Sequence, residues 1–222
     1  MRVFVSIALT WVLLAGASLM PIAAATAQQP RTARGRLFPP AKLGELEVRD
    51  RDEWQEPDRI MDALGIADGA RVADVGAGGG WFTIRLAKRV GPNGRVYAED
   101  IQHRMIESIE RRVLRENLRW VETKLGTPTD PKLPGNLNAV LIVDTYPQLD
   151  EPVLILKHLA AALAPNGRVG IVDWRKDVFG PGPAMNERLE PEVIIRDATR
   201  AGLRLHAHHK FLRYQYLLVF TR

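Results

Sequence analysis

The chain has 222 residues, of which 46% are hydrophobic and 26% charged, so it is long enough to bury the core of a single domain. It contains no cysteine, which excludes disulfides and a lipid-modified cysteine, and no residue spacing is typical of a metal site. The net charge of +5 is modest, and no combined basic and aromatic patch suggests nucleic-acid binding.

Residues 1–27 are predicted to form a secretory signal peptide. After Arg2, the segment Val3–Ala27 carries no charge, and Pro21 interrupts its apolar run. Ala25-Thr26-Ala27 has the small-x-small pattern of a signal-peptidase site. We therefore expect cleavage after Ala27 and export, to the periplasm or the medium. The alternative is an uncleaved inner-membrane anchor, because the uncharged run is long enough to span a bilayer.

Residues 28–41 are predicted to be a flexible linker, and residues 42–222 to be the folded domain. The linker contains Arg31, Arg34 and Arg36 together with three prolines and few apolar residues. A solvated linker is the preferred interpretation. The alternative is contact of this basic stretch with anionic lipid, and we expect a membrane partner only if the preceding segment is not cleaved.

A helix is predicted over Glu56–Leu64, with Pro57 in its first turn, where a missing N–H costs nothing. Trp54 and Gln55 precede this helix. One hypothesis is that they fold over a bound ligand as a lid.

The next segment carries the strongest functional signal. A short buried strand, 72–75, runs into a turn containing Gly76, Gly78 and Gly80, and a helix with an apolar face follows. Glycine permits positive φ and close backbone approach, and a helix start presents N–H groups, so this unit can cradle a nucleotide-like ligand. Dinucleotide sites use G-x-G-x-x-G, but here Trp81 occupies the last position of that pattern. The alternative is a tight turn without a ligand.

Two acids end the next predicted strand, 94–100. An acid about 20 residues after the glycines is the expected partner of ribose hydroxyls, and Asp100 lies 24 residues after Gly76. A carboxylate can accept two hydrogen bonds from a vicinal diol. Because adjacent strand residues point to opposite faces, only one acid is expected to reach the ribose, and Glu99 competes with Asp100 for this role.

The rest of the chain continues the alternation of helices and strands. Strands are predicted over 118–125, 139–143, 167–173, 203–209 and 214–220, and helices over 103–116, 153–163 and 191–201. Alternation of this kind implies a parallel sheet covered on both faces. The last two strands are too close in sequence for a crossover, so they are expected to form an antiparallel hairpin.

The pattern Asp-x-Gly-x-Gly-x-Gly over residues 74–80 resembles the first motif of class I S-adenosylmethionine-dependent methyltransferases. The resemblance implies an α/β, Rossmann-like, doubly wound fold with a mostly parallel seven-stranded sheet of order 3-2-1-4-5-7-6 and a C-terminal antiparallel hairpin. It implies S-adenosylmethionine as the cofactor and a small molecule as the methyl acceptor, and it selects Asp100 over Glu99. The cofactor-binding residues that it implies are Asp74, Gly76, Gly78, Gly80, Asp100 and Asp144.

The resemblance covers residues 55–222. Leu163–Val169 is similar to the family's Leu-x-Pro-Gly-Gly-x-hydrophobic turn, and Gln215–Phe220 is similar to the final strand of many small-molecule members. The chain departs from the family where many members carry an acid that holds adenine. Thr127 stands there, and Asp130 follows three residues later, so the adenine-binding residue stays unassigned.

The stretch after the fourth strand, 144–147, differs from the Asn-Pro-Pro-Tyr motif of DNA and protein amide enzymes, so those acceptors are not expected. Asp144 is predicted to hold the methionine ammonium or to accept a proton from a nucleophile, and the alternative is that it caps the turn. Tyr146 and Trp174 are predicted to lie on the substrate side. The loop Phe179–Pro183 is either a pocket wall or a rigid surface loop.

Two other functions stay open at this point. A non-catalytic exported protein could retain the fold for binding, because S-adenosylmethionine is made in the cytosol. A nicotinamide-dependent oxidoreductase is disfavoured by Trp81 at the third-glycine position. The sequence indicates no catalytic base and no oligomeric state.

Overall fold

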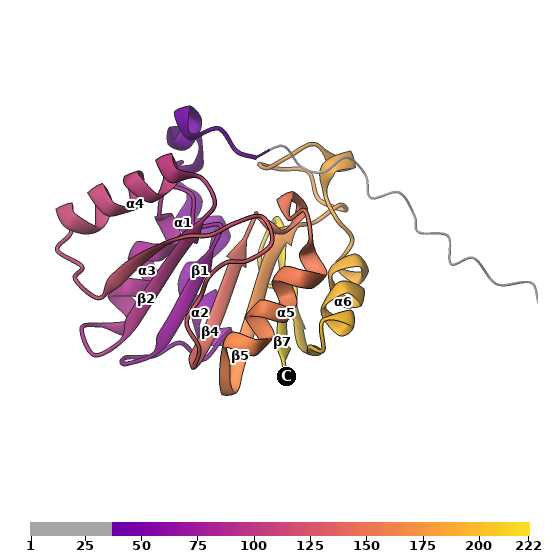
Figure 1. Ribbon diagram of the computed structural model, residues 1–222. Helices are drawn as coiled ribbons and strands as arrows, with labels where there is room; N and C mark the ends of the chain where they lie inside the picture. The colour runs from indigo at the N-terminus through magenta and orange to yellow at the C-terminus, as the bar shows by residue number, and fades with distance from the viewer. Residues whose placement is uncertain (1–36) are drawn as a thin grey trace, which may run out of the picture. The chain divides into compact units, whose positions relative to one another are not determined.

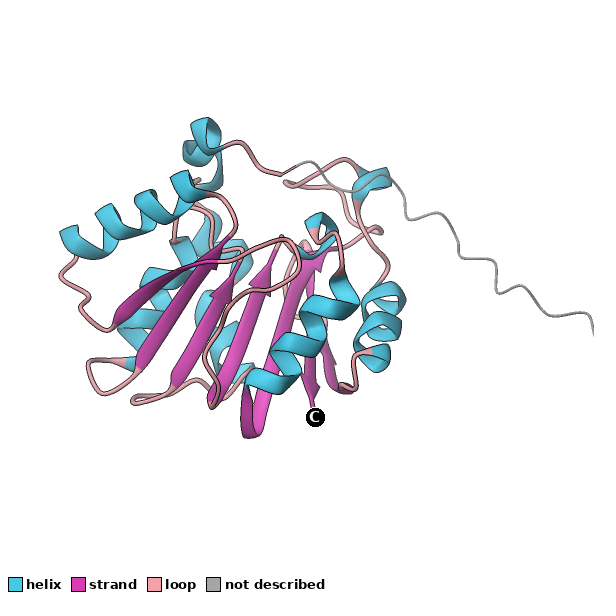
Figure 2. Cartoon of the chain, viewed as in Figure 1, coloured by secondary structure: helices cyan, strands magenta, loops and turns pink. Residues whose placement is uncertain are grey.

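The computed structural model describes residues 37–222, so the predicted signal peptide and most of the predicted linker lie outside the described residues. Within this range one sheet is covered by helices on both faces (Figures 1 and 2). The strands are β1 (Arg71–Val75), β2 (Arg95–Asp100), β3 (Val121–Leu125), β4 (Leu137–Val143), β5 (Leu163–Trp174), β6 (Arg204–His209) and β7 (Gln215–Thr221). The helices are α1 (Arg51–Gln55), α2 (Pro57–Ala63), α3 (Trp81–Val90), α4 (His103–Arg115), α5 (Pro152–Ala162) and α6 (Pro191–Arg200), with short 3₁₀ helices η1 (Pro40–Leu46), η2 (Tyr146–Gln148) and η3 (Met185–Glu187).

The seven-stranded sheet has the order β3-β2-β1-β4-β5-β7-β6. The first five strands of this order pair in parallel, whereas β7 pairs antiparallel with both β5 and β6. The predicted α/β fold, strand order and terminal hairpin are therefore confirmed. Strands β2 and β3 extend the sheet on one side of β1, whereas β4 and β5 extend it on the other side, so the order of the strands reverses between β1 and β4. In open α/β sheets, ligands bind beyond the carboxyl ends of the strands at such a point.

Each face of the sheet is buried by its own set of helices. Helices α5 and α6 lie in front of the sheet in Figure 1, where Leu156 and Ile194 pack with Val140 and Ile142. Leu141 belongs to the core on the opposite face, beneath α2 and α3. Residues 139–143 of β4 are thus all apolar because alternate residues serve different cores, as the sequence predicts.

Some element boundaries differ from the prediction. The helices η1 and α1 have no predicted counterpart, and Glu56, with φ of 44°, separates α1 from α2. β5 begins at Leu163 rather than residue 167, because the residues on both sides of the turn at Asn166 pair with β4. No helix within residues 37–222 is long and apolar enough to cross a membrane.

Candidate functional site

The glycine turn after β1 has a backbone that other residues rarely adopt. Gly76, Gly78 and Gly80 have φ of 68°, 56° and 79°, in the left-handed region where a Cβ is disfavoured. At Gly76 a Cβ would also lie 2.2 Å from Thr145 Cγ2. Thr145 Oγ1 donates to the Gly76 carbonyl oxygen at 3.2 Å. The turn itself therefore requires these glycines, and it is held against the end of β4.

Both acids at the end of β2 contact this turn. Asp100 Oδ2 accepts a hydrogen bond from the Gly78 N–H at 3.0 Å, and its Oδ1 accepts one from the Gln102 N–H at 2.8 Å. Glu99 Oε2 accepts one from the Gly76 N–H at 3.3 Å. The sequence argument allowed one acid near the ligand. The structure places both acids in contact with the turn, Asp100 through the Gly78 N–H and Glu99 through the Gly76 N–H.

The environments of the two acids differ. Burial, together with the nearby carboxylates of Asp100 and Asp74, raises the pKa of Glu99 to about 8, although the hydrogen bond from the Gly76 N–H opposes the shift. Glu99 is therefore expected to be neutral at pH 7. Burial also raises the pKa of Asp100, but backbone N–H groups oppose this by favouring its ionised form. Each carboxylate oxygen has two acceptor positions, so Asp100 can accept further bonds from a vicinal diol.

Asp74 joins β1 to the helix that follows the turn. Its buried carboxylate accepts a hydrogen bond from Thr83 Oγ1, in α3, at 2.7 Å. Burial raises the pKa of Asp74 to about 6, and the Thr83 bond and the charge of Arg51 oppose that shift. Asp74 thus holds the start of α3 against β1.

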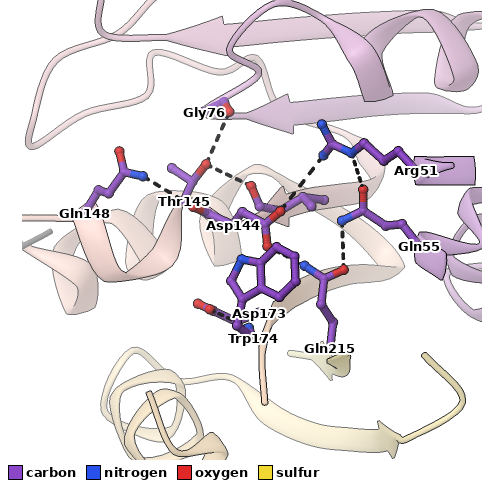
Figure 3. A network of polar contacts seen from close by, with 10 residues as sticks. Arg51, Gln55, Gly76, Asp144, Thr145, Gln148, Asp173, Trp174 and Gln215 are labelled. Carbon is purple, nitrogen blue, oxygen red and sulfur yellow. Dashed lines mark hydrogen bonds and ion pairs between the residues drawn. The ribbon is translucent and has the colours of Figure 1, made fainter. Parts of the chain in front are cut away.

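A chain of polar side chains connects α1 with the ends of β4 and β7 (Figure 3). Arg51 Nε donates to Gln55 Oε1 at 2.6 Å, and Gln55 Nε2 donates to Gln215 Oε1 at 2.8 Å. Gln215 Nε2 in turn donates to Asp144 Oδ1. Arg51 Nη2 lies 3.9 Å from Asp144 Oδ2. Gln55, for which a lid was one hypothesis, is therefore buried in a network that fixes α1 over this edge of the sheet.

Asp144 directs its side chain into this network. It has φ of 57°, and burial raises its pKa to about 6, against the charge of Arg51 and the bonds from both glutamines. The turn after β4 is closed by other groups, since Gln148 N–H donates to Thr145 O and Gln148 Nε2 donates to Asp144 O. The carboxylate is thus not used to cap the turn.

Trp174 packs under α1 and under the loop that follows β5. Its ring centroid lies 5.4 Å from that of Trp54, and a Cβ at Gly182 would lie 2.5 Å from its ring. The loop is fixed by buried Arg188, whose guanidinium donates to four loop carbonyls, those of Pro183, Arg175, Val178 and Pro181, at 2.8–3.1 Å. The segment predicted as a wall or a rigid surface loop is therefore a rigid cover over Trp174.

Tyr146 does not lie where the substrate-side prediction requires. It is 1% exposed and belongs to the core beneath α5 and α6. Its hydroxyl donates to Asp197 Oδ2, in α6, at 3.1 Å. This position makes Tyr146 a contact between the end of β4 and α6, so the predicted role is corrected to a structural one.

Asp173, at the end of β5, escaped the sequence interpretation. It is 0% exposed, and its Oδ1 accepts a hydrogen bond from the Trp174 N–H at 2.7 Å. Its Oδ2 has no hydrogen-bond partner among the described residues. Burial, together with the charge of Asp144, raises its pKa to about 8. The sequence did offer a signal for Asp173, since it is an acid that follows an apolar run in the strand next to the one that leads to Asp144. Gln215 and Arg51 were missed because only the fold brings them together.

The adenine contact stays unassigned. Thr127 Oγ1 accepts a hydrogen bond from the Asp130 N–H at 2.9 Å, and Asp130 Oδ1 accepts one from the Lys132 N–H at 2.8 Å. The two candidates therefore order the turn after β3. Their geometry does not select either of them for adenine.

Known proteins share this architecture. A family model described as a methyltransferase domain matches residues 72–167. Nocamycin O-methyltransferase of Saccharothrix syringae is 28% identical over 68% of this chain and 57% of its own length, and demethylmenaquinone methyltransferase of Lactobacillus johnsonii is 29% identical over 58% and 52%. The crystal structure of a SAM-dependent methyltransferase from Aquifex aeolicus is 28% identical, with a TM-score of 0.78 over 82% of this chain and 98% of that one. The chain thus contains a methyltransferase domain, matched over residues 72–167, and it is similar to S-adenosylmethionine-dependent methyltransferases.

The methyltransferase-domain match and the similarity to the SAM-dependent enzyme from Aquifex aeolicus imply S-adenosylmethionine as the cofactor. The geometry fits it, because Gly76, Gly78 and Gly80 hold the turn in the left-handed conformation that glycine permits, and Asp100 lies beside the turn, bonded to the Gly78 N–H. The chain spans about half the length of the curated relatives that it matches.

Proposed function

We propose that this protein transfers a methyl group from S-adenosylmethionine to a small-molecule acceptor. The observation that carries the proposal is the left-handed glycine turn between β1 and α3, with Asp100 bonded to its Gly78 N–H. The names of two curated relatives refer to nocamycin and demethylmenaquinone, both small molecules. The identity of the acceptor is open.

When bound, S-adenosylmethionine supplies a methyl group activated by a sulfonium. The protein therefore has to bind the cofactor and the acceptor, orient them toward each other and exclude water from the site. The glycine turn and Asp100 bind the nucleoside part. Helix α1 and the aromatic pair of Trp54 and Trp174 exclude water from the ends of β4 and β5. Trp174, at the end of β5, is the group that we assign to the acceptor side.

Transfer is tested with S-adenosylmethionine labelled with tritium in its methyl group. The purified protein is incubated with this cofactor and a small-molecule extract of the source cells, and label in the small-molecule products is measured. We expect transfer by the wild type and none by Asp100→Ala. Binding of S-adenosylhomocysteine without any transfer would favour the alternative, a non-catalytic protein that retains the fold.

We also propose that the chain is exported, with residues 1–27 cleaved after Ala27. The support is the uncharged N-terminal run with its small-x-small site. The expected result of N-terminal mass spectrometry on fractionated cells is a chain that begins at Gln28 outside the cytosol. An intact Met1 in the membrane fraction would indicate an inner-membrane anchor, and a full-length cytosolic chain would contradict export.

A further inference from the structure

The segment before α1, residues 37–50, lies directly on the glycine turn. A Cβ at Gly79 would be 3.1 Å from Leu43 Cδ2, in η1. Gln102 Nε2 donates to the Phe38 carbonyl oxygen at 3.1 Å, and the backbone N–H of Gln102 binds the predicted ribose acid. The segment therefore touches two sides of the place where the nucleoside of the cofactor is expected, beside the start of α4 (Figure 1).

This segment buries little surface against the rest of the protein. Its described side chains are all exposed or half-buried, and the large apolar side chains of Leu37 and Val48 are among the exposed ones. Helix α1, which follows, contributes the buried side chains of Trp54 and Gln55. A region with little apolar burial opens locally at low free energy. Residues 37–50 can therefore leave the turn while α1 stays in place, and we call them the gate segment.

An ion pair fastens the gate segment at the turn. The carboxylate of Glu47 pairs with the guanidinium of Arg112, in α4. The same nitrogen of Arg112, Nη1, donates to the Gly79 carbonyl oxygen at 3.4 Å. The side chain of Arg112 is 17% exposed and that of Glu47 is 44% exposed. A partly exposed pair of this kind gives a modest stabilisation that salt weakens. It can therefore hold the gate segment closed without preventing it from opening.

We propose that the gate segment opens to admit and release the cofactor, and that the pair of Glu47 and Arg112 is its latch. The proposal rests on the proposed function, because the turn that the segment covers is the cofactor site assigned above. Exchange of the cofactor then passes through an open state. A weaker latch populates that state both with and without ligand, so the association and dissociation rates rise together while the Kd changes little.

Alkylation of a single cysteine measures the opening itself. The protein has no cysteine of its own, so Leu43→Cys carries one thiol, at the contact with Gly79. The rate of its reaction with iodoacetamide reports how often the gate segment opens. Glu47→Gln in this background should speed the reaction about threefold. Saturating S-adenosylhomocysteine should slow it about fivefold or more, because the bound ligand favours the closed state.

Exchange kinetics measure the consequence for the ligand in protein that retains Leu43. Binding and release of S-adenosylhomocysteine are followed by stopped-flow tryptophan fluorescence, since Trp81 begins α3 directly after the turn. Glu47→Gln should raise the association and dissociation rate constants about threefold each. The Kd should stay within about 1.5-fold of the wild-type value, because the latch acts equally on both directions of exchange.

Glu45→Gln is the matched control. Glu45 lies in the same segment, but its carboxylate pairs with Lys42, within η1, at 3.0 Å. Its replacement should change the alkylation and exchange rates less than about 1.5-fold. Salt gives a second check, because potassium chloride at about 0.5 M screens the latch. It should accelerate exchange in the wild type and have a smaller effect in Glu47→Gln.

The outcomes are distinguishable. Equal exchange rates in wild type and Glu47→Gln would overturn the proposal, because the gate segment would then not lie on the path of the ligand. A faster dissociation alone, with a weaker Kd, would overturn it too, since Glu47 would then stabilise the bound ligand rather than a closed gate. Failure of the wild type to bind S-adenosylhomocysteine at all would contradict the proposed function itself.

Discussion

Replacement of Asp173 by asparagine should make the protein more stable at alkaline pH. The side chain is fully buried, Oδ2 has no partner among the described residues, and the pKa is raised to about 8 by burial and by Asp144. In the unfolded chain an aspartate has a pKa of about 3.9. Between these two values the folded state retains a proton that the unfolded state has lost. Stability from this group is therefore fully present below about pH 4 and is lost as the pH rises through 8.

The size of the effect follows from proton linkage. Over this interval each pH unit removes up to about 1.4 kcal/mol of the free energy of unfolding. Asparagine has nearly the same shape, can still accept the Trp174 N–H bond and cannot ionise. We expect Asp173→Asn to lie within about 1 kcal/mol of the wild type at pH 4.5 and to be at least about 2 kcal/mol more stable at pH 8.

Urea unfolding at intervals from pH 4.5 to 8.5 measures this difference. Glu99 and Asp74 titrate in both proteins, so the variant-minus-wild-type curve largely isolates Asp173. A difference that does not change with pH would refute the reasoning, because it would mean that Asp173 is ionised and solvated in the folded protein.

Three further substitutions test the scaffold of the site. Gly76→Ala should cost about 2 kcal/mol and abolish S-adenosylhomocysteine binding, because its Cβ meets Thr145 and φ is positive; melts with and without ligand measure both effects, and an unchanged ligand shift would contradict this. Arg188→Met should cost about 2–4 kcal/mol and make the loop after β5 sensitive to chymotrypsin, because hydrogen bonds to its carbonyls are lost; equal cleavage of both proteins would count against it. Thr83→Val should cost about 1–3 kcal/mol in urea unfolding, and more above pH 6, because ionised Asp74 loses its donor; Thr83→Ser should be near neutral, and equal losses in both variants would point to packing instead.

The sheet could be predicted because its signals are local. The apolar segment 139–143 indicated a strand buried on both faces, and the short joint before Gln215 indicated the hairpin. The glycine turn was predictable for the same reason, since glycine spacing reports directly on backbone geometry. The structure confirmed the fold and the order of the strands.

The remaining features depend on contacts between distant residues. Helix α1 has five residues and no periodic pattern, and it is held by Gln55 bonded to Gln215, 160 residues away. Tyr146 lies three residues after the end of β4, and the positive φ of Asp144 redirects the chain between them, so sequence alone did not show that its ring enters the core. A five-residue helix of this kind gains its stability from tertiary packing.

Cofactor binding tests the central claim most directly. Calorimetry should be run with S-adenosylhomocysteine and NAD on wild type, and with S-adenosylhomocysteine on Asp100→Ala. We predict micromolar binding of S-adenosylhomocysteine to wild type, no binding of NAD, and loss of S-adenosylhomocysteine binding in the variant. Absence of binding at millimolar S-adenosylhomocysteine, or equal affinity in wild type and Asp100→Ala, would contradict the assignment of this site.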